Sequence, residues 1–146
     1  MQILVDTNVL LRAAQRGQPA GQSAINSIKR LHRQQHVLCL APQNVVEFWN
    51  VCTRPADVNG LGLSVTAAER YVKKLSRMFA IVPDSLQTFE KWLELVVQHS
   101  VVGAKVHDAR LVAIMNVHGI GAILTFNVKD FSRYDGVTPM HPDSVG

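Results

Sequence analysis

The chain has 146 residues, of which 47% are hydrophobic and 18% are charged, with a formal net charge of +4. This composition is typical of a globular domain with a core of its own, and it excludes an intrinsically disordered chain. The longest apolar runs, such as Leu111–Met115, are far shorter than the roughly 20 residues of a membrane-spanning helix, and no basic segment typical of a signal peptide opens the chain.

Apolar segments alternate with amphipathic ones along the chain. The apolar segments are predicted strands, over residues 2–5, 37–40, 79–82, 122–125 and 137–140. The amphipathic segments are predicted helices, over about residues 7–15, 20–34, 42–53 and 104–118, with two more that begin near Ser64 and Asp84. Strands that alternate with helices predict an α/β fold in three layers with a mostly parallel central sheet. We expect a single domain over residues 1–146, and ligands of such sheets bind at the carboxyl ends of the strands.

Residues at the ends of the predicted helices match the known end preferences. Pro42 suits a first helical turn, because its missing N–H costs nothing there. Ser64, or Thr66 with its capping-box spacing, can cap the fourth helix, and Asp84 can cap the fifth. Gly119 is expected to end the last helix.

Two cysteines, Cys39 and Cys52, lie in apolar segments without the spacing of metal ligands. This pattern indicates buried thiols in a reducing compartment, and we therefore expect a cytoplasmic protein.

Asp6 directly follows the first predicted strand and precedes a helix. In one interpretation it caps this helix, since Asp accepts hydrogen bonds from the free N–H groups of a first turn. In the other it is a metal ligand at the carboxyl end of a strand.

Glu47 also has two interpretations. It forms a polar stripe with Gln43, Asn50 and Arg54 on the third helix, which is either an exposed face or one wall of a cleft.

Asp108 enters a helix that is apolar nearly all round. The helix dipole tolerates an acid in the first turn, and Lys105 is a possible partner. Otherwise a buried carboxylate needs a strong partner such as a metal ion, because an unpaired buried charge is costly.

The segment LTFNVKDF, residues 124–131, offers further oxygen groups after a strand, on Thr125, Asn127 and Asp130. It is either a plain loop, in which Asn and Asp bond their own backbone, or part of the same site. Oxygen ligands without His or Cys spacing favour Mg²⁺ or Mn²⁺ over zinc. A metal of this kind positions a water molecule against a phosphodiester.

Positive charge is concentrated near the start, because residues 7–46 contain no acid. A stretch of one sign favours a polyanion such as nucleic acid, although a merely solvated surface is the alternative. The candidate RNA-binding residues are Arg12, Arg16, Arg30 and Arg33, with Arg54 and Lys129 as a second possible path.

Four segments in this order resemble the PIN-domain ribonucleases, and specifically the toxins of VapBC-type toxin–antitoxin pairs. They are ILVDTNVLL, VVEFWNV, HDARLVAIM and LTFNVKDF, and the stretch NGLGLS resembles one branch of that family. The resemblance covers essentially the whole chain. It implies metal-dependent cleavage of RNA, a cognate antitoxin protein as partner, and a homodimer.

The resemblance also implies the site residues. Asp6, Glu47 and Asp108 match the acidic triad that binds Mg²⁺ or Mn²⁺, with Asp6 and Asp108 as the main ligands. The side chains that order the site by hydrogen bonds are Thr7, Asn8, Thr125 and Asn127. Asn127 stands where many relatives have a fourth acid, and Asp130 is the residue that can supply the missing charge.

Other functions fit the sequence less well. A phosphotransferase of the haloacid-dehalogenase type needs an acid where Asn8 stands, and a receiver module needs a second acid beside the first. A non-catalytic PIN-like module that binds RNA or protein stays open as the alternative.

Overall fold

Five short strands form one parallel sheet in the order β3-β2-β1-β4-β5 in the computed structural model, which describes all 146 residues. The strands are β1 Gln2–Val5, β2 Val37–Leu40, β3 Ala80–Ile81, β4 Ala122–Leu124 and β5 Thr138–Met140. The helices are α1 Thr7–Ala13, α2 Pro19–Arg33, α3 Pro42–Thr53, α4 Val65–Met78, α5 Leu86–Gln98 and α6 Val106–His118. The prediction of a mostly parallel sheet is confirmed, and all five strands are parallel.

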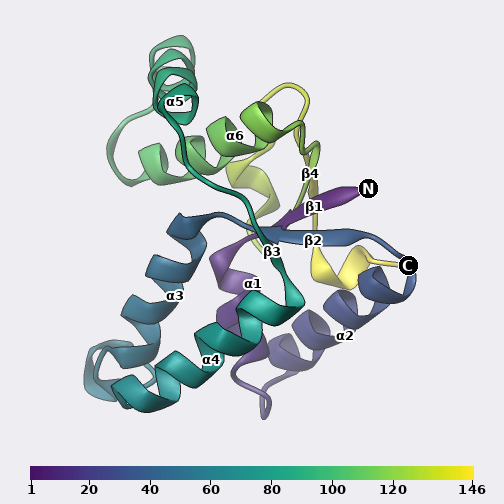
Figure 1. Ribbon diagram of the computed structural model, residues 1–146, viewed down its shortest axis with the longest axis vertical. Coiled ribbons are helices and arrows are strands. Elements are labelled where there is room, and N and C mark those ends of the chain that lie inside the picture. Colours follow the sequence, from purple (N-terminus) through teal and green to yellow (C-terminus); the bar gives the residue numbers. More distant parts are fainter.

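Helices cover both faces of the sheet (Figure 1), so the predicted three layers are confirmed. Side chains alternate between the faces along each strand. Ile3 and Val5 of β1 pack on α1, α2, α3 and α4, whereas Leu4 packs on α5 and α6. The helix α6 is buried nearly all round, as its apolar sequence predicts, because it lies between the sheet and α5.

The parallel register brings the ends of distant segments together. Val5 pairs with Leu124, so the residues that follow them, Asp6 and Thr125, emerge side by side. β1 lies in the middle of the sheet, with β2 on one side and β4 on the other. The starts of α1 and α3 and the loop after β4 therefore meet at the carboxyl ends of the central strands.

Most of the predicted helix ends are confirmed. Pro42 occupies the first turn of α3, Ser64 caps α4 through the N–H of Ala67, and Gly119 ends α6 with a positive φ. The expected cap at Asp84 is wrong, because the hydroxyl of Ser85 accepts the N–H of Thr88 instead.

Both cysteines are buried and free, as predicted. None of the helices combines the length and the hydropathy of a membrane-spanning segment.

Candidate functional site

Asp6 is buried at the carboxyl end of β1, and its two carboxylate oxygens have different partners. Oδ1 accepts the backbone N–H of Thr7 at 2.8 Å, so Asp6 does cap α1. Oδ2 accepts the hydroxyl of Thr125 at 2.8 Å and the side-chain amide of Asn8 at 3.3 Å. The cap therefore uses one oxygen, and the second oxygen belongs to a network that joins β1 to the end of β4.

The loop after β4 is fixed to the start of α1 by this network. The side-chain oxygen of Asn8 accepts the backbone N–H of Phe126 at 3.2 Å, and the hydroxyl oxygen of Thr125 accepts the N–H of Asn127 at 3.0 Å. Asn127 takes part through its backbone, while its side chain is exposed. Of the four predicted site-ordering residues, Thr7, Asn8 and Thr125 contribute side chains, and Asn127 contributes its N–H.

Glu47 reaches the same edge from the middle of α3. The hydroxyl of Thr7 donates to its Oε1 at 3.1 Å, and the amide of Asn44 donates to the oxygen of Thr7 at 3.1 Å. Asn44 is fully buried. Its side-chain oxygen accepts the N–H of Ala41, so both ends of the buried amide have partners and the first turn of α3 is closed. The polar stripe through Glu47 therefore borders the site and is not a plain solvent-facing surface.

Gln43 links Glu47 to the start of α6. Its Nε2 donates to Oε1 of Glu47 at 3.4 Å and to the backbone carbonyl of His107 at 3.0 Å. Its Oε1 is buried and has no partner in the protein. Sequence reasoning missed Gln43 and Asn44 as site residues, although the spacing of four residues between Gln43 and Glu47 was a usable signal.

Asp108 lies in the first turn of α6 and is partly exposed. Lys105, the possible partner of Asp108, does not form an ion pair with it. The ammonium of Lys105 instead lies 2.5 Å from Oδ1 of Asp130, in the turn that follows β4. Asp130 thus sits beside Asp108 but has a cation of its own.

The acids influence one another electrostatically. The pKa of Asp6 is raised to about 6, chiefly by burial and also by the charges of Asp108 and Glu47, while the hydrogen bonds from Thr125 and Thr7 oppose the shift. Burial also raises the pKa of Asp108 to about 6, with contributions from Asp130 and Glu47, whereas Lys105 opposes the shift. All four acids therefore belong to one cluster, although they come from separate parts of the chain.

The chemistry of this cluster suits a hard divalent cation. Asp6, Glu47 and Asp108 offer only oxygen, and no Lys, Arg or His forms an ion pair with any of them. Negative charge that is wholly or partly withdrawn from water and not balanced by a basic group is costly, and a bound cation would reduce that cost. No three acidic, His or Cys side chains lie close enough to hold a metal ion directly. Mg²⁺ needs only one or two direct carboxylates, because it keeps several of its waters.

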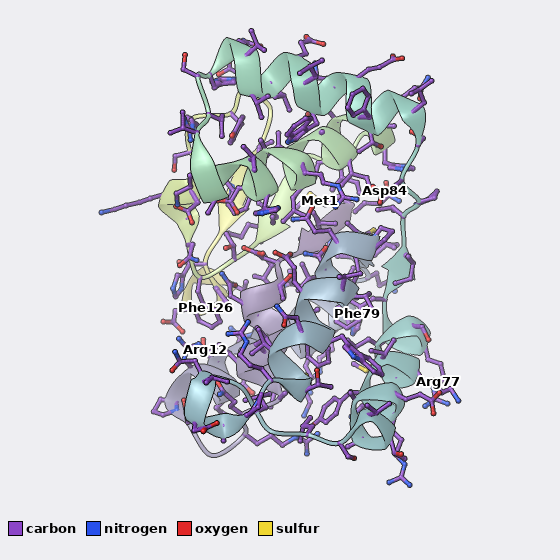
Figure 2. All side chains as sticks on the ribbon, turned by 90° about the vertical axis from the view of Figure 1, so that its left-hand side faces the viewer. Met1, Arg12, Arg77, Phe79, Asp84 and Phe126 are labelled. Carbon is purple, nitrogen blue, oxygen red and sulfur yellow. The ribbon has the colours of Figure 1, made fainter.

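The predicted RNA-binding residues do not form one patch. Arg30 donates to the carbonyl of Val145 at 2.5 Å and, with Arg33, lies where α2 ends. The end of α2 leads into the start of β2. Both arginines therefore lie at the amino ends of the strands, whereas the acids lie at the carboxyl ends. Arg12 is exposed near the end of α1, and Lys129 is exposed in the turn beside Asp130. Arg54 follows the last residue of α3 and is partly buried. Figure 2 views the molecule from the side toward which β1 runs.

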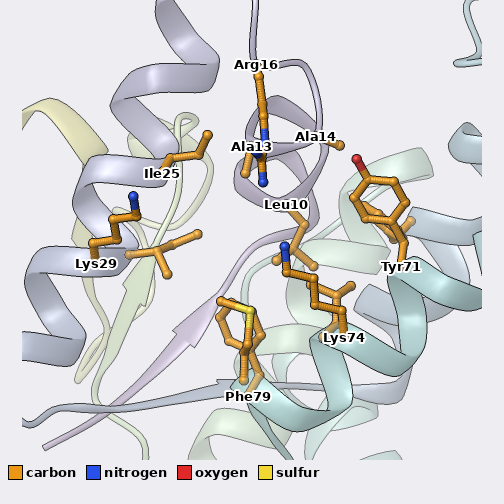
Figure 3. A pocket seen from close by; sticks show the side chains of 13 residues that line it. Leu10, Ala13, Ala14, Arg16, Ile25, Lys29, Tyr71, Lys74 and Phe79 are labelled. Atoms are coloured by element: carbon orange, nitrogen blue, oxygen red, sulfur yellow. The ribbon is translucent and has the colours of Figure 1, made fainter.

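Arg16, the remaining predicted RNA-binding residue, lines an apolar pocket between α1, α2 and α4. Its cavity is about 150 Å³, and ten of its thirteen lining residues are hydrophobic. Arg16, Lys29 and Lys74 bring positive charge to this lining (Figure 3). The pocket is separate from the acids, because none of the four acids lines it.

A family model described as the PIN domain matches residues 3–137. No curated protein matches the chain in sequence.

Several solved structures share the fold. VapBC2 of Rickettsia felis, bound to a DNA fragment from its promoter, has a TM-score of 0.71 at 14% identity, over 97% of this chain and 98% of that chain. FitAcB of Neisseria gonorrhoeae has a TM-score of 0.66 at 20% identity, over 97% and 98%. VapC20 of Mycobacterium tuberculosis, a toxin that cleaves the sarcin–ricin loop, has a TM-score of 0.61 at 22% identity, over 83% and 86%.

Proposed function

The chain belongs to the PIN domain family, and from this membership we propose that it is a metal-dependent endoribonuclease and the toxin of a toxin–antitoxin pair. One observation carries the catalytic part of the proposal. Asp6 follows β1, whereas Glu47 and Asp108 lie on α3 and α6; the charge of Glu47 helps to raise the pKa values of both Asp6 and Asp108, and none of the three acids forms an ion pair with Lys, Arg or His. A fold neighbour that cleaves the sarcin–ricin loop supports RNA as the substrate class.

In this proposal Asp6 and Asp108 would be the main ligands of Mg²⁺ or Mn²⁺, and Glu47 would complete the acidic triad that holds the ion. Such an ion supplies Lewis acidity and a water of lowered pKa next to the phosphodiester. The chain itself supplies orientation. Thr125 and Asn8 fix Oδ2 of Asp6, the oxygen that does not cap α1, and Thr7 fixes the carboxylate of Glu47. Hydrogen bonds of this kind keep ligand oxygens in place before the ion and the substrate arrive.

The partner we propose is a cognate antitoxin protein, in line with fold neighbours that are toxin–antitoxin complexes. The pocket lined by Arg16, Lys29 and Lys74 suits an amphipathic segment with acidic residues, because its lining is apolar and its charges are positive. An exposed apolar row on α5, formed by Leu86, Phe89, Leu93 and Val97, supports a homodimer. Light scattering of the purified protein tests the dimer. We place the protein in the cytoplasm, without a membrane partner.

The test of catalysis is cleavage of single-stranded RNA by the purified protein. We expect cleavage with Mg²⁺ or Mn²⁺ and none in EDTA. Asp6→Ala and Asp108→Ala should each lower the rate by at least about a hundredfold, which is the scale of losing one electrostatic catalytic group. Asp57→Ala, which removes an exposed acid outside the cluster, is the matched control.

The alternative is a non-catalytic PIN-like module that binds RNA or protein. It is favoured by one observation, the cap that Asp6 provides to α1, because a cap needs the acid without any chemistry. Full activity in EDTA or in either alanine variant would exclude the proposed mechanism. RNA binding without any cleavage would favour the non-catalytic module.

A further inference from the structure

Lys105 and Asp130 form an ion pair at the edge of the acidic cluster. Lys105 ends the turn before α6, and its ammonium lies 2.5 Å from the carboxylate of Asp130. The Lys105 side chain is 51% exposed and that of Asp130 is 26% exposed. Lys105 directly precedes α6, whose first turn contains Asp108, and both charges of the pair act on the pKa of Asp108.

This pair has little to do with holding the fold together. Exposed ion pairs contribute little to stability, because solvent screens them and ordering two long side chains costs entropy. The pair also makes Asp130 a poor direct metal ligand, since one of its oxygens is already bound by an ammonium. A different role fits a cation that is held near Asp108, which has no ion-pair partner of its own.

The charge of the cluster indicates this role. Asp6, Glu47 and Asp108 repel a phosphate when they are ionised, and a substrate phosphate needs a cation nearby. An ammonium has three N–H donors. One of them is directed at Asp130, and the exposed side of Lys105 leaves the others free for phosphate oxygens.

We propose that Lys105 binds a phosphate of the substrate backbone next to the bond that is cut, and that Asp130 is the positioning residue that holds its ammonium beside Asp108. The proposal rests on the function proposed above and assigns its fourth acid a role other than metal binding. It adds Lys105 to the RNA-binding residues, and the predicted RNA-binding residue Lys129 lies next to Asp130 in the same turn.

The first test measures binding of a fluorescent single-stranded RNA by anisotropy in EDTA, where no cleavage is expected. Lys105→Gln should raise Kd about tenfold, the scale of one charged hydrogen bond. The slope of log affinity against log salt should fall by about 0.7. Lys105→Arg should keep most of the affinity. The control is Lys73→Gln, which removes an exposed lysine from its pair with Glu69 on α4, outside the acidic cluster.

The second test addresses Asp130 through the metal alone. Asp130→Asn should leave the Mn²⁺ affinity, measured by calorimetry without RNA, within about twofold of wild type, whereas losing a metal-site partner costs about 10–100-fold. It should lower RNA affinity, because Lys105 loses its fixed position. The double variant with Lys105→Gln should bind RNA no more weakly than Lys105→Gln alone, since Asp130 acts on RNA only through the ammonium of Lys105.

The outcomes separate this proposal from the proposed function. If wild type cuts RNA and Lys105→Gln binds as tightly as Lys73→Gln, the phosphate role of Lys105 is wrong and the ribonuclease stands. If Asp130→Asn loses Mn²⁺ affinity, Asp130 is a metal ligand and not a positioning residue. If wild type neither binds nor cuts RNA, both proposals are wrong.

Discussion

Thr7 and Glu47 lie 40 positions apart in the sequence, and the hydroxyl of Thr7 donates to the carboxylate of Glu47 at 3.1 Å. The same hydroxyl oxygen accepts the amide of Asn44. One buried side chain at the start of α1 therefore holds two side chains of α3. Hydrogen bonds from such neutral side chains hold the acids of the site in position.

Thr7→Val keeps the shape of the side chain and removes both hydrogen bonds. It leaves the amide of Asn44 buried without an acceptor, which costs about 1–3 kcal/mol. We expect Tm to fall by roughly 5 °C, since 1 kcal/mol corresponds to roughly 2–5 °C in a domain of this size. Thr7→Ser, which keeps the hydroxyl, is the control. An equal Tm for Thr7→Val and wild type would mean that Asn44 finds another partner.

Asp108→Asn should melt a few degrees higher than wild type in EDTA at neutral pH. The pKa of Asp108 is raised to about 6 by burial and by Asp130, so its ionised form is unfavourable in the folded protein without metal. Added Mg²⁺ should stabilise wild type and have little effect on the variant. Calorimetry with Asp57→Asn as the control makes the comparison. A lower Tm for Asp108→Asn would show that the acid stabilises the start of α6 instead.

The stability of the metal-free protein should depend on pH through Asp6. Its pKa is about 6 when folded and 3.8 in the unfolded reference, so the folded protein holds the proton more tightly. The free energy of unfolding therefore falls as pH rises from about 4 to about 6, and it levels off above that range. For Asp6 alone the loss is about 3 kcal/mol. Solvent screening makes the loss smaller for Asp108, which is partly exposed.

Urea unfolding in EDTA across this pH range measures the effect as the difference between wild type and Asp6→Asn. Wild type should lose stability relative to the variant as pH rises. A difference that stays constant with pH would contradict the raised pKa.

Gln43→Leu tests the link between α3 and α6. It removes the donor to Glu47 and His107, but it also removes a buried oxygen that has no partner. These effects oppose each other, so we expect Tm to change by less than about 3 °C. RNA cleavage should fall about tenfold with unchanged RNA affinity, because Glu47 and Asp108 are less well fixed. Gln98→Leu, at the end of α5, is the control, and a Gln43→Leu variant of normal activity would show that the link is dispensable.

Arg30→Gln with Arg33→Gln separates binding from chemistry. Both residues lie at the amino ends of the strands, away from the acids at the carboxyl ends. They should therefore affect RNA affinity and not the cleavage step. If they bind the RNA backbone, affinity falls for all sequences alike and the salt slope falls by about 0.7 per lost contact. Single-turnover cleavage at saturating RNA should stay near wild type. Unchanged affinity and slope would assign this stretch to a solvated surface or a protein partner.

The sequence predicted the fold well because its signals are local. Apolar strands of four residues, Pro42 and Gly119 specify where elements begin and end without knowledge of their neighbours. The cap at Asp84 failed because Ser85, one residue later, offers an equivalent acceptor, and Asp84 binds Arg110 instead. Single-residue choices between adjacent capping residues depend on such tertiary contacts.

Asp6 and Asp108 were predicted as site residues for a similar reason, since one follows a strand and the other starts an apolar helix, whereas Glu47 was identified from the polar stripe on α3. Pairings across the site were not predictable. Lys105 is three positions from Asp108, which made that pair the obvious one, yet the fold brings Asp130 closer. Asn44 looked like an ordinary polar residue of α3, because nothing in its own segment indicates that Thr7 will lie against it.

The hydrogen bond from Thr125 to Asp6 joins residues 119 positions apart. β1 is synthesised first, but its neighbour β4 is among the last elements to leave the ribosome. Contacts between such distant segments form late, because the loop between them must be closed first. A growing chain that ends before residue 125 has Asp6 and Glu47 but cannot fix them. If the chain has the proposed activity, we expect it to stay inert on the ribosome that makes it until nearly the whole chain has emerged.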